Sequence, residues 1–116
     1  MYYSLIAIQT CTRTGGGAHS KNRAHPLPGQ GLDTEMFVEC SRTIRDAYPV
    51  GTVFIIWAKV TDREGGTPFL YSHHSWDFVA IGEAPAQKWI KNGQLGLNKR
   101  YAEISDIKSV SNNFKS

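Results

Sequence analysis

The sequence predicts an α+β fold: a curved antiparallel sheet with one main helix at about residues 34–48 and a short helix at about residues 85–92. Two observations carry this prediction. Runs rich in β-branched and aromatic residues recur between turn residues, as in short strands, and one segment has apolar residues at helical spacing. The chain of 116 residues has the usual length of one domain, so we expect a single domain over residues 1–116. The expected form of the sheet is a small closed or half-open barrel.

Four segments are typical of strands. Residues 2–10 are rich in aromatic and β-branched types and predict a buried strand. Residues 52–61 form a nearly continuous apolar run, which predicts a central strand covered on both faces. Residues 67–72 and 76–81 follow so closely that the three strands predict an antiparallel meander. Residues 96–107 leave two interpretations open, a helical piece or a terminal strand.

The main helix is predicted by apolar residues at three- and four-residue steps. Phe37, Cys40, Ile44 and Tyr48 fall on one helical face, and Pro49 ends the segment. Because Cys40 lies on this apolar stripe, we expect its thiol to be buried and structural.

The short helix lies between two residues that mark helix ends. Pro85 suits the first helical position, and Gly93 suits the position after the last. The residues between them form about two turns, with Trp89 and Ile90 directed inward.

Residues 11–32 are predicted to form a long glycine-rich basic loop. They contain five glycines and two prolines and show no hydrophobic period. They also hold the whole formal excess of charge, which is +3. Residues 1–32 have three basic side chains and no acidic one, whereas the rest of the chain has ten of each sign. Loops of this length are usually functional or disordered, and a solvated flexible connection is the other interpretation.

The composition of this loop predicts an anion- or nucleic-acid-binding site. Three successive glycines present backbone N–H groups without side-chain obstruction, as phosphate cradles do. Basic side chains beside them attract phosphate. The segment does not match the Walker pattern. The predicted site residues are Arg13, Gly15, Gly16, Gly17, Lys21 and Arg23.

A second cluster of polar and aromatic residues follows the strand at 67–72. An exposed aromatic ring beside a basic loop is a usual way to hold single-stranded nucleic acid or a flipped base. Histidine and aspartate also serve in acid–base chemistry. The alternative is that the rings simply cover one end of the sheet. With two histidines from the loop, the predicted pocket residues are His19, His25, Tyr71, His73, His74, Trp76 and Asp77.

The spacing of the histidines and cysteines predicts no metal site and no cofactor. Adjacent histidines point to opposite faces of a strand, and no pair shows the CxxC or HxxxH spacing of a zinc site. A cysteine nucleophile, Cys11 or Cys40 with a histidine, would need the fold to bring the pair together. Because no motif assigns a catalytic residue, we expect a binding protein more than an enzyme and leave catalysis open.

The sequence gives no sign of membrane insertion or secretion. The N-terminal segment has no basic region, and its apolar run ends at Gln9. No stretch has the length needed to span a bilayer, and two cysteines do not make the dense pattern of a secreted disulfide scaffold. We therefore expect a cytoplasmic protein with reduced thiols.

Residues 48–82 carry a family resemblance. They run from Tyr-Pro-Val-Gly-Thr-Val-Phe-Ile-Ile-Trp-Ala-Lys-Val-Thr to Trp-Asp-Phe-Val-Ala-Ile-Gly. This stretch resembles the small PUA-like barrels of the ASCH and EVE type, in which a helix leads through an xxGxxF turn into a curled antiparallel sheet. The resemblance implies a module that binds RNA or modified bases in a pocket with an aromatic wall, and it assigns no individual base-contacting residue. The whole chain is also similar in character to products of mobile gene cassettes, such as those of integrons.

Two functions are expected from these features. The first is a binding module for nucleic acid or a nucleotide-like anion, in which the loop holds phosphate and Tyr71 or Trp76 stacks on a base. The alternative is a homo-oligomeric protein, such as a homodimer, that binds or converts a small molecule with the 11–32 loop as a lid over the histidine pair. A protein-interaction domain is a third interpretation. The expected partner is thus a nucleic acid or a small anionic ligand, and no membrane.

Overall fold

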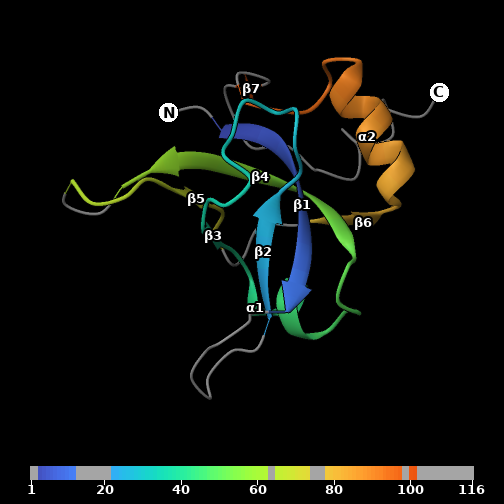
Figure 1. The fold of residues 1–116 in the computed structure, drawn as a ribbon, viewed down its shortest axis with the longest axis horizontal. Coiled ribbons are helices and arrows are strands. Elements are labelled where there is room, and N and C mark those ends of the chain that lie inside the picture. The colour runs from blue at the N-terminus through green and yellow to red at the C-terminus, as the bar shows by residue number, and fades with distance from the viewer. Residues whose placement is uncertain (1–2, 13–21, 63–64, 74–77, 98–99, 102–116) are drawn as a thin grey trace.

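The chain folds into a strongly curved, barrel-like sheet with two helices packed on it in the described region (Figure 1). The computed structural model describes residues 3–12, 22–62, 65–73 and 78–97, and the backbone of residues 100–101. In chain order the described elements are β1 (Tyr3–Thr12), β2 (Asn22–Pro26), β3 (Val38–Glu39), α1 (Arg42–Asp46), β4 (Val53–Thr61), β5 (Phe69–Tyr71), β6 (Val79–Ile81), α2 (Glu83–Lys91) and β7 (Arg100–Tyr101). The predicted α+β class with a curved sheet is confirmed.

β1 and β4 form the central pair of the sheet. They are antiparallel, with Ile6 opposite Ile56. β2 and β7 extend the sheet along the other edge of β1, and β5 and β6 extend it along the other edge of β4. β3 pairs in parallel with β5 and also lies against β2. The two ends of the strand order β2-β1-β4-β5-β3 therefore meet, which gives the sheet its barrel shape.

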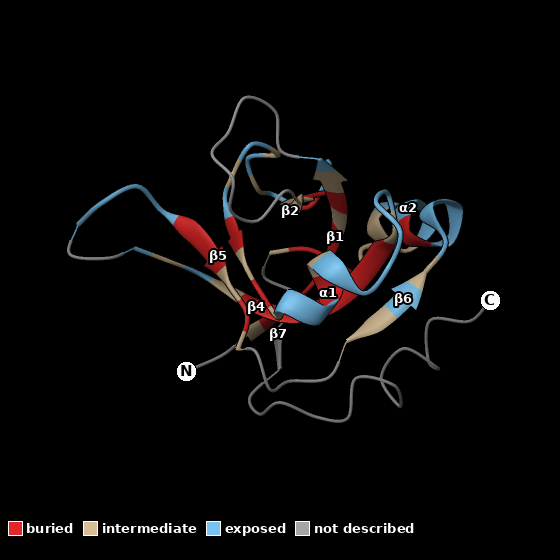
Figure 2. Cartoon of the chain, turned by 90° about the horizontal axis from the view of Figure 1, so that it is seen from below, coloured by how far each residue is buried: buried red, intermediate tan, exposed pale blue. Residues whose placement is uncertain are grey.

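Side chains of β1 and β4 alternate between two buried faces, because successive residues of a strand point to opposite sides. On the outer face, Leu5 and Trp57 belong to the cluster that α2 covers. On the inner face, Ile6 and Phe54 pack in a cluster with Ile44 of α1. Most of β4 is buried in Figure 2. The predicted central strand is thus covered on both faces, as its apolar run indicated.

The main helix is much shorter than predicted. Within residues 34–48 only Arg42–Asp46 is helical. Val38 and Cys40 are both buried, and a two-residue step between buried positions is the period of a strand. Phe37, which the helical pattern placed in the core, is 51% exposed. The apolar residues that suggested one helical face therefore belong to a strand and a short helix.

The predicted loop at 11–32 contains a strand. β1 continues to Thr12, and β2 pairs with it so that Thr12 stands opposite Asn22. In β2, Ala24 and Pro26 are buried and alternate with partly exposed neighbours. Glycine and proline dominate the flanking sequence and hide this two-residue period. The residues that join β1 to β2 lie outside the described part of the chain.

The chain that follows β2 is anchored to β1 by hydrogen bonds. The N–H of Leu27 donates to Ala7 O (3.1 Å), and the buried side chain of Gln30 also bonds the backbone of Ala7. The carbonyl oxygen of Gln30 accepts from Leu97 N–H (2.7 Å). This part of the predicted loop is therefore a fixed component of the barrel wall.

β4, β5 and β6 do not form the predicted meander. β5 pairs with the end of β4, at Lys59–Thr61, and β6 pairs with its start, at Val53–Ile55. Both short strands share one edge of β4 because its nine residues offer room for two partners. The third expected strand therefore returns to β4 and does not continue outward from β5.

The short helix predicted near the C-terminal part is confirmed as α2. It begins at Glu83, so that Pro85 occupies its third position and not its first. Within residues 96–107, where two interpretations were open, the described residues Arg100–Tyr101 form β7 beside the start of β1. None of the described helices is long and apolar enough to cross a membrane.

Candidate nucleic-acid interface

α1 packs against the end of the β1–β2 pair at which Thr12 and Asn22 stand. The side-chain amide of Asn22 donates to the carbonyl oxygen of Arg45 (3.0 Å), and Asn22 stands opposite Thr12 at the end of the two strands. Figure 1 shows α1 at this end of β1 and β2. Ser41 caps the helix, because its Oγ accepts from the N–H of Thr43 (3.1 Å). The cap stabilises the first turn of α1, and the Asn22 bond joins the last turn to β2.

Three arginines stand on the two elements that this contact joins. Arg23 follows Asn22 on β2, whereas Arg42 and Arg45 belong to α1. Arg42 is exposed, and Arg23 and Arg45 are half-buried. We call Asn22, Arg23, Arg42 and Arg45 the hairpin surface, in which Arg23 points to the side of β2 opposite to the Asn22 amide and α1. Arginines outnumber the acidic residue of α1, Asp46, so this surface suits a phosphate or another anion.

The predicted anion site is only partly within the described residues. Arg23 is half-buried on β2, opposite Cys11. The other predicted residues of this site lie outside the described part: Arg13, Gly15, Gly16, Gly17 and Lys21. Arg42 and Arg45 were not predicted as site residues, because basic and acidic side chains are equal in number after residue 32. Their spacing of three residues, which makes helical neighbours, was the available signal.

Two described members of the predicted pocket, His25 and Tyr71, lie on the two strands that flank β3 and face one side of the wall. β3 lies against β2 and pairs with β5. On β2, His25 alternates with buried residues, and its Nδ1 is 3.1 Å from Pro26 O. On β5, Tyr71 follows buried Leu70 and stands opposite Glu39 of β3. By alternation, these side chains point to the outer side of the barrel.

The histidine pair after β5 is described in part. His73 is half-buried and follows Ser72, whose N–H donates to Glu39 O (2.8 Å). Tyr71 stands opposite Lys59, whose Nζ lies 5.5 Å from the centre of the Tyr3 ring. Four predicted pocket residues lie outside the described part: His19, His74, Trp76 and Asp77. The pairing of β4 with β5 thus places Tyr71 beside the cationic side chain of Lys59, which the sequence did not predict.

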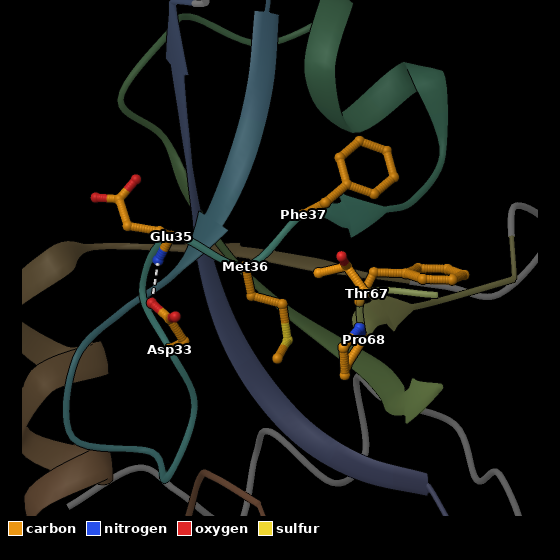
Figure 3. Close-up of a pocket in the computed structure, with 7 residues that line it drawn as sticks. Asp33, Glu35, Met36, Phe37, Thr67 and Pro68 are labelled. Atoms are coloured by element: carbon orange, nitrogen blue, oxygen red, sulfur yellow. Dashed lines mark hydrogen bonds between the residues drawn. The ribbon is translucent and has the colours of Figure 1, made fainter. Parts of the chain in front are cut away.

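A hollow of about 480 Å³ opens where the chain enters β3 and β5 (Figure 3). Its lining is mainly apolar and includes Phe37, whose ring centre lies 6.2 Å from that of Phe69. Two carboxylates stand at one side, and Asp33 Oδ1 accepts from the N–H of Glu35 (2.8 Å). The lining residues are Asp33, Glu35, Met36, Phe37, Thr67, Pro68 and Phe69. The sequence did not predict this hollow, because only the parallel β3–β5 pairing joins its two segments.

The two thiols have different surroundings. Cys40 is buried, and burial raises its pKa to about 11, with Arg45 lowering it and Glu39 raising it. At neutral pH this thiol is protonated and is not the thiolate that attacks or binds metal. Cys11 is half-buried on β1. Among the described residues, no group of three histidine, cysteine or acidic side chains stands close enough to hold a metal ion.

Comparisons of the chain with protein-family models, with curated proteins and with solved structures find no match. The PUA-like resemblance therefore stays a prediction.

Proposed function

We propose that this chain is a small binding module for nucleic acid or a nucleotide-like anion, and that the hairpin surface is its phosphate site. The observation that carries the proposal is the bond from Asn22 to the carbonyl of Arg45 (3.0 Å). It holds a helix with two arginines against a strand with a third. In the sequence, Arg13 directly follows the last residue of β1 and Lys21 directly precedes the first residue of β2, which adds basic residues to the same hairpin.

Arginine is well suited to this role. Its planar guanidinium donates in a fixed fork that matches two phosphate oxygens, and it stays charged at all relevant pH values. Neutralising phosphates releases counterions, so binding of this kind weakens steeply as salt rises. A site of a few arginines favours modest, salt-sensitive affinity, which differs from the strongly basic stripe of a dedicated duplex binder.

The test is fluorescence anisotropy with labelled single-stranded and duplex oligonucleotides at two salt concentrations. We expect binding at low salt that weakens at high salt. The double variant R23Q/R42Q should bind more weakly, and its plot of log affinity against log salt should be shallower by up to about 1.4 for a single strand, since each lost phosphate contact accounts for about 0.7.

The matched control is K88Q/K91Q, which removes two exposed positive charges from the last turn of α2. Figure 1 shows α2 apart from the end of the barrel that carries α1. This control should keep most of the wild-type affinity. Absent or salt-insensitive binding of the wild type at low salt would refute the proposal, and so would equal losses in the two double variants.

A small-molecule-binding protein or enzyme is the second candidate. The hollow of about 480 Å³ favours it, because ligand sites are mostly apolar hollows of about 300–1,000 Å³ with a few polar groups. Residues 22–26 cannot belong to a lid, since they form β2. A thermal-shift screen against a metabolite library would show a stabilising ligand, and light scattering would test the proposed homodimer. A screen without hits would count against this candidate.

A further inference from the structure

We propose that the hollow between Asp33–Phe37 and Thr67–Phe69 holds a nucleobase of a single-stranded nucleic acid, stacked on Phe37, while the phosphates of the strand lie on the hairpin surface. This inference depends on the proposed nucleic-acid function and adds a base site to it. The hollow is open on one side and mainly apolar, with carboxylates along one side (Figure 3). A flat ring with polar groups on its edge matches that lining.

Phe37 is a rigidly mounted and accessible ring. It is 51% exposed, whereas its neighbour Phe69 is buried, and the two rings are tilted by 54°. Its backbone is fixed because Leu70 N–H donates to Phe37 O (2.8 Å). Because the backbone is already fixed, stacking of a base orders only the side-chain dihedral angles of the ring. A bound base would cover this exposed ring, which explains why an apolar side chain faces solvent here.

The charges of the hollow decide which part of a nucleotide enters. Asp33 and Glu35 stand on its lining, and no basic residue does among those that line it. Carboxylates repel a phosphate, but they accept hydrogen bonds from the amino groups of bases. A carboxylate has acceptor capacity beyond the one bond that Asp33 receives from Glu35 N–H. The base therefore belongs in the hollow and the phosphates outside it.

The cations for those phosphates are on adjacent elements. β3 begins directly after Phe37 and leads to α1, so Arg42 follows Phe37 by five residues, at most about 17 Å of extended chain. On its other side, β3 lies against β2, which carries Arg23. Tyr71 is two residues beyond Phe69 on β5 and faces the same side of the strand. A single strand of about four or more nucleotides can occupy such a continuous path.

A duplex cannot use this site, because its bases are stacked and paired inside the helix. The two ligand classes should therefore separate the base site from the phosphate site. The test compares wild type and F37S in anisotropy titrations with a labelled single strand, the matching duplex and nucleoside monophosphates as competitors. V60S is the matched control, since Val60 is 38% exposed, stands opposite Leu70 on β4 and β5, and is not among the residues that line the hollow.

We expect F37S to weaken single-strand binding by about 5- to 150-fold, the effect of losing one stacked base, and to leave duplex binding within about twofold. V60S should leave both unchanged, and circular dichroism should show that both variants are folded. If F37S binds the single strand as wild type does while R23Q/R42Q binds it weakly, the base site is refuted and the phosphate site stands. If the wild type binds neither oligonucleotide, both proposals fail.

Competition by nucleoside monophosphates distinguishes a single strand from a free nucleotide as the ligand. Monophosphates should compete weakly, because they lack the neighbouring phosphates that the arginines would hold. Competition as effective as that of the unlabelled strand would refute the single-strand assignment.

A second variant, D33N, keeps an oxygen that can accept from Glu35 N–H but removes the carboxylate charge. The wild type should prefer oligo(dC) and oligo(dA) over oligo(dT), and D33N should lose this preference; an unchanged preference would refute the role of Asp33.

Discussion

The side-chain amide of Gln30 hydrogen-bonds both backbone polar groups of Ala7. Its Oε1 accepts from Ala7 N–H (2.7 Å), and its Nε2 donates to Ala7 O (2.8 Å). β7 pairs with the start of β1 and β2 pairs with its second half, so the amide stands in the interval between them. With 3% of Gln30 exposed, the bonds satisfy buried groups that need partners. The Gln30 side chain therefore takes the place of a partner strand at this point of the edge of β1.

Replacing Gln30 by leucine should destabilise the fold. The change keeps a side chain of similar size but leaves the buried N–H of Ala7 without its acceptor, which we expect to lower the free energy of unfolding by about 2–4 kcal/mol. Urea denaturation followed by tryptophan fluorescence measures this. Gln87→Leu, at an exposed position of α2, is the matched control and should change stability by at most about 0.5 kcal/mol. Equal effects of the two variants would contradict this role of Gln30.

Gly96 is fixed beside the same glutamine. Its φ is +131°, and a Cβ there would lie 3.2 Å from both Cα and O of Gln30. We expect Gly96→Ala to cost about 2–4 kcal/mol, because backbone strain and a clash with main-chain atoms add. Gly51 also has a positive φ (+98°), but a Cβ there would meet nothing within 4 Å. Gly51→Ala should therefore cost about 1 kcal/mol, and thermal unfolding of the two variants should rank them in that order.

The long strands could be predicted from the sequence because their signal is local. The apolar run at 52–61 specifies a buried strand without knowledge of its partners, and β4 forms over nearly the same residues. β3 could not be predicted in this way. It has two residues and forms because β5 offers a parallel edge. The local sequence at Phe37–Cys40 does not predict this pairing. The three-residue step from Phe37 to Cys40 matches a helical face, and only the pairing with β5 shows that Val38–Glu39 is a strand.

The candidate site was harder to predict for the same reason. Arg23 could be identified from composition, because the first part of the chain has basic side chains and no acidic ones. The grouping of Arg42 and Arg45 with it depends on the bond between Asn22 and Arg45, residues that are 23 positions apart. The role of buried Gln30 could not be predicted either. It depends on unpaired backbone groups at the edge of β1, which only the fold reveals.

Cys40 should make stability depend on pH above 9. Burial raises the pKa of its thiol from the ordinary value of 9.0 to about 11 in the folded protein. The thiol must therefore stay protonated in the folded state while the unfolded chain ionises, so its contribution is complete below pH 9 and is lost as pH rises towards 11. The shift corresponds to about 3 kcal/mol. Cys40→Ala should flatten this part of the curve when urea midpoints are compared between pH 8 and 11.

The same burial predicts how the thiols react. In the native protein at pH 8, Ellman's reagent should modify Cys11, which is half-buried, well before Cys40, and both should react at once in urea. Cys11→Ser, which leaves Cys40 alone, should then show almost no native-state reaction. Rapid modification of that variant would mean that the inner face opens far more often than its packing implies.

Asn22→Ala should weaken oligonucleotide binding although it removes no charge. Without the amide, the hydrogen bond that joins Arg45 O to β2 is lost, so α1 and its two arginines are held less firmly against the strand that carries Arg23. A hydrogen bond worth about 0.5–1.5 kcal/mol allows a loss of affinity of up to about tenfold, seen by anisotropy at low salt. Gln9→Ala is the matched control, because it removes an amide that bonds Glu83 Oε1 (3.0 Å) on α2 and no arginine-bearing element. Should Asn22→Ala bind as tightly as wild type while R23Q/R42Q binds weakly, the arginines would act without the fixed position of α1, and the bond that carries the proposed function would have no part in it.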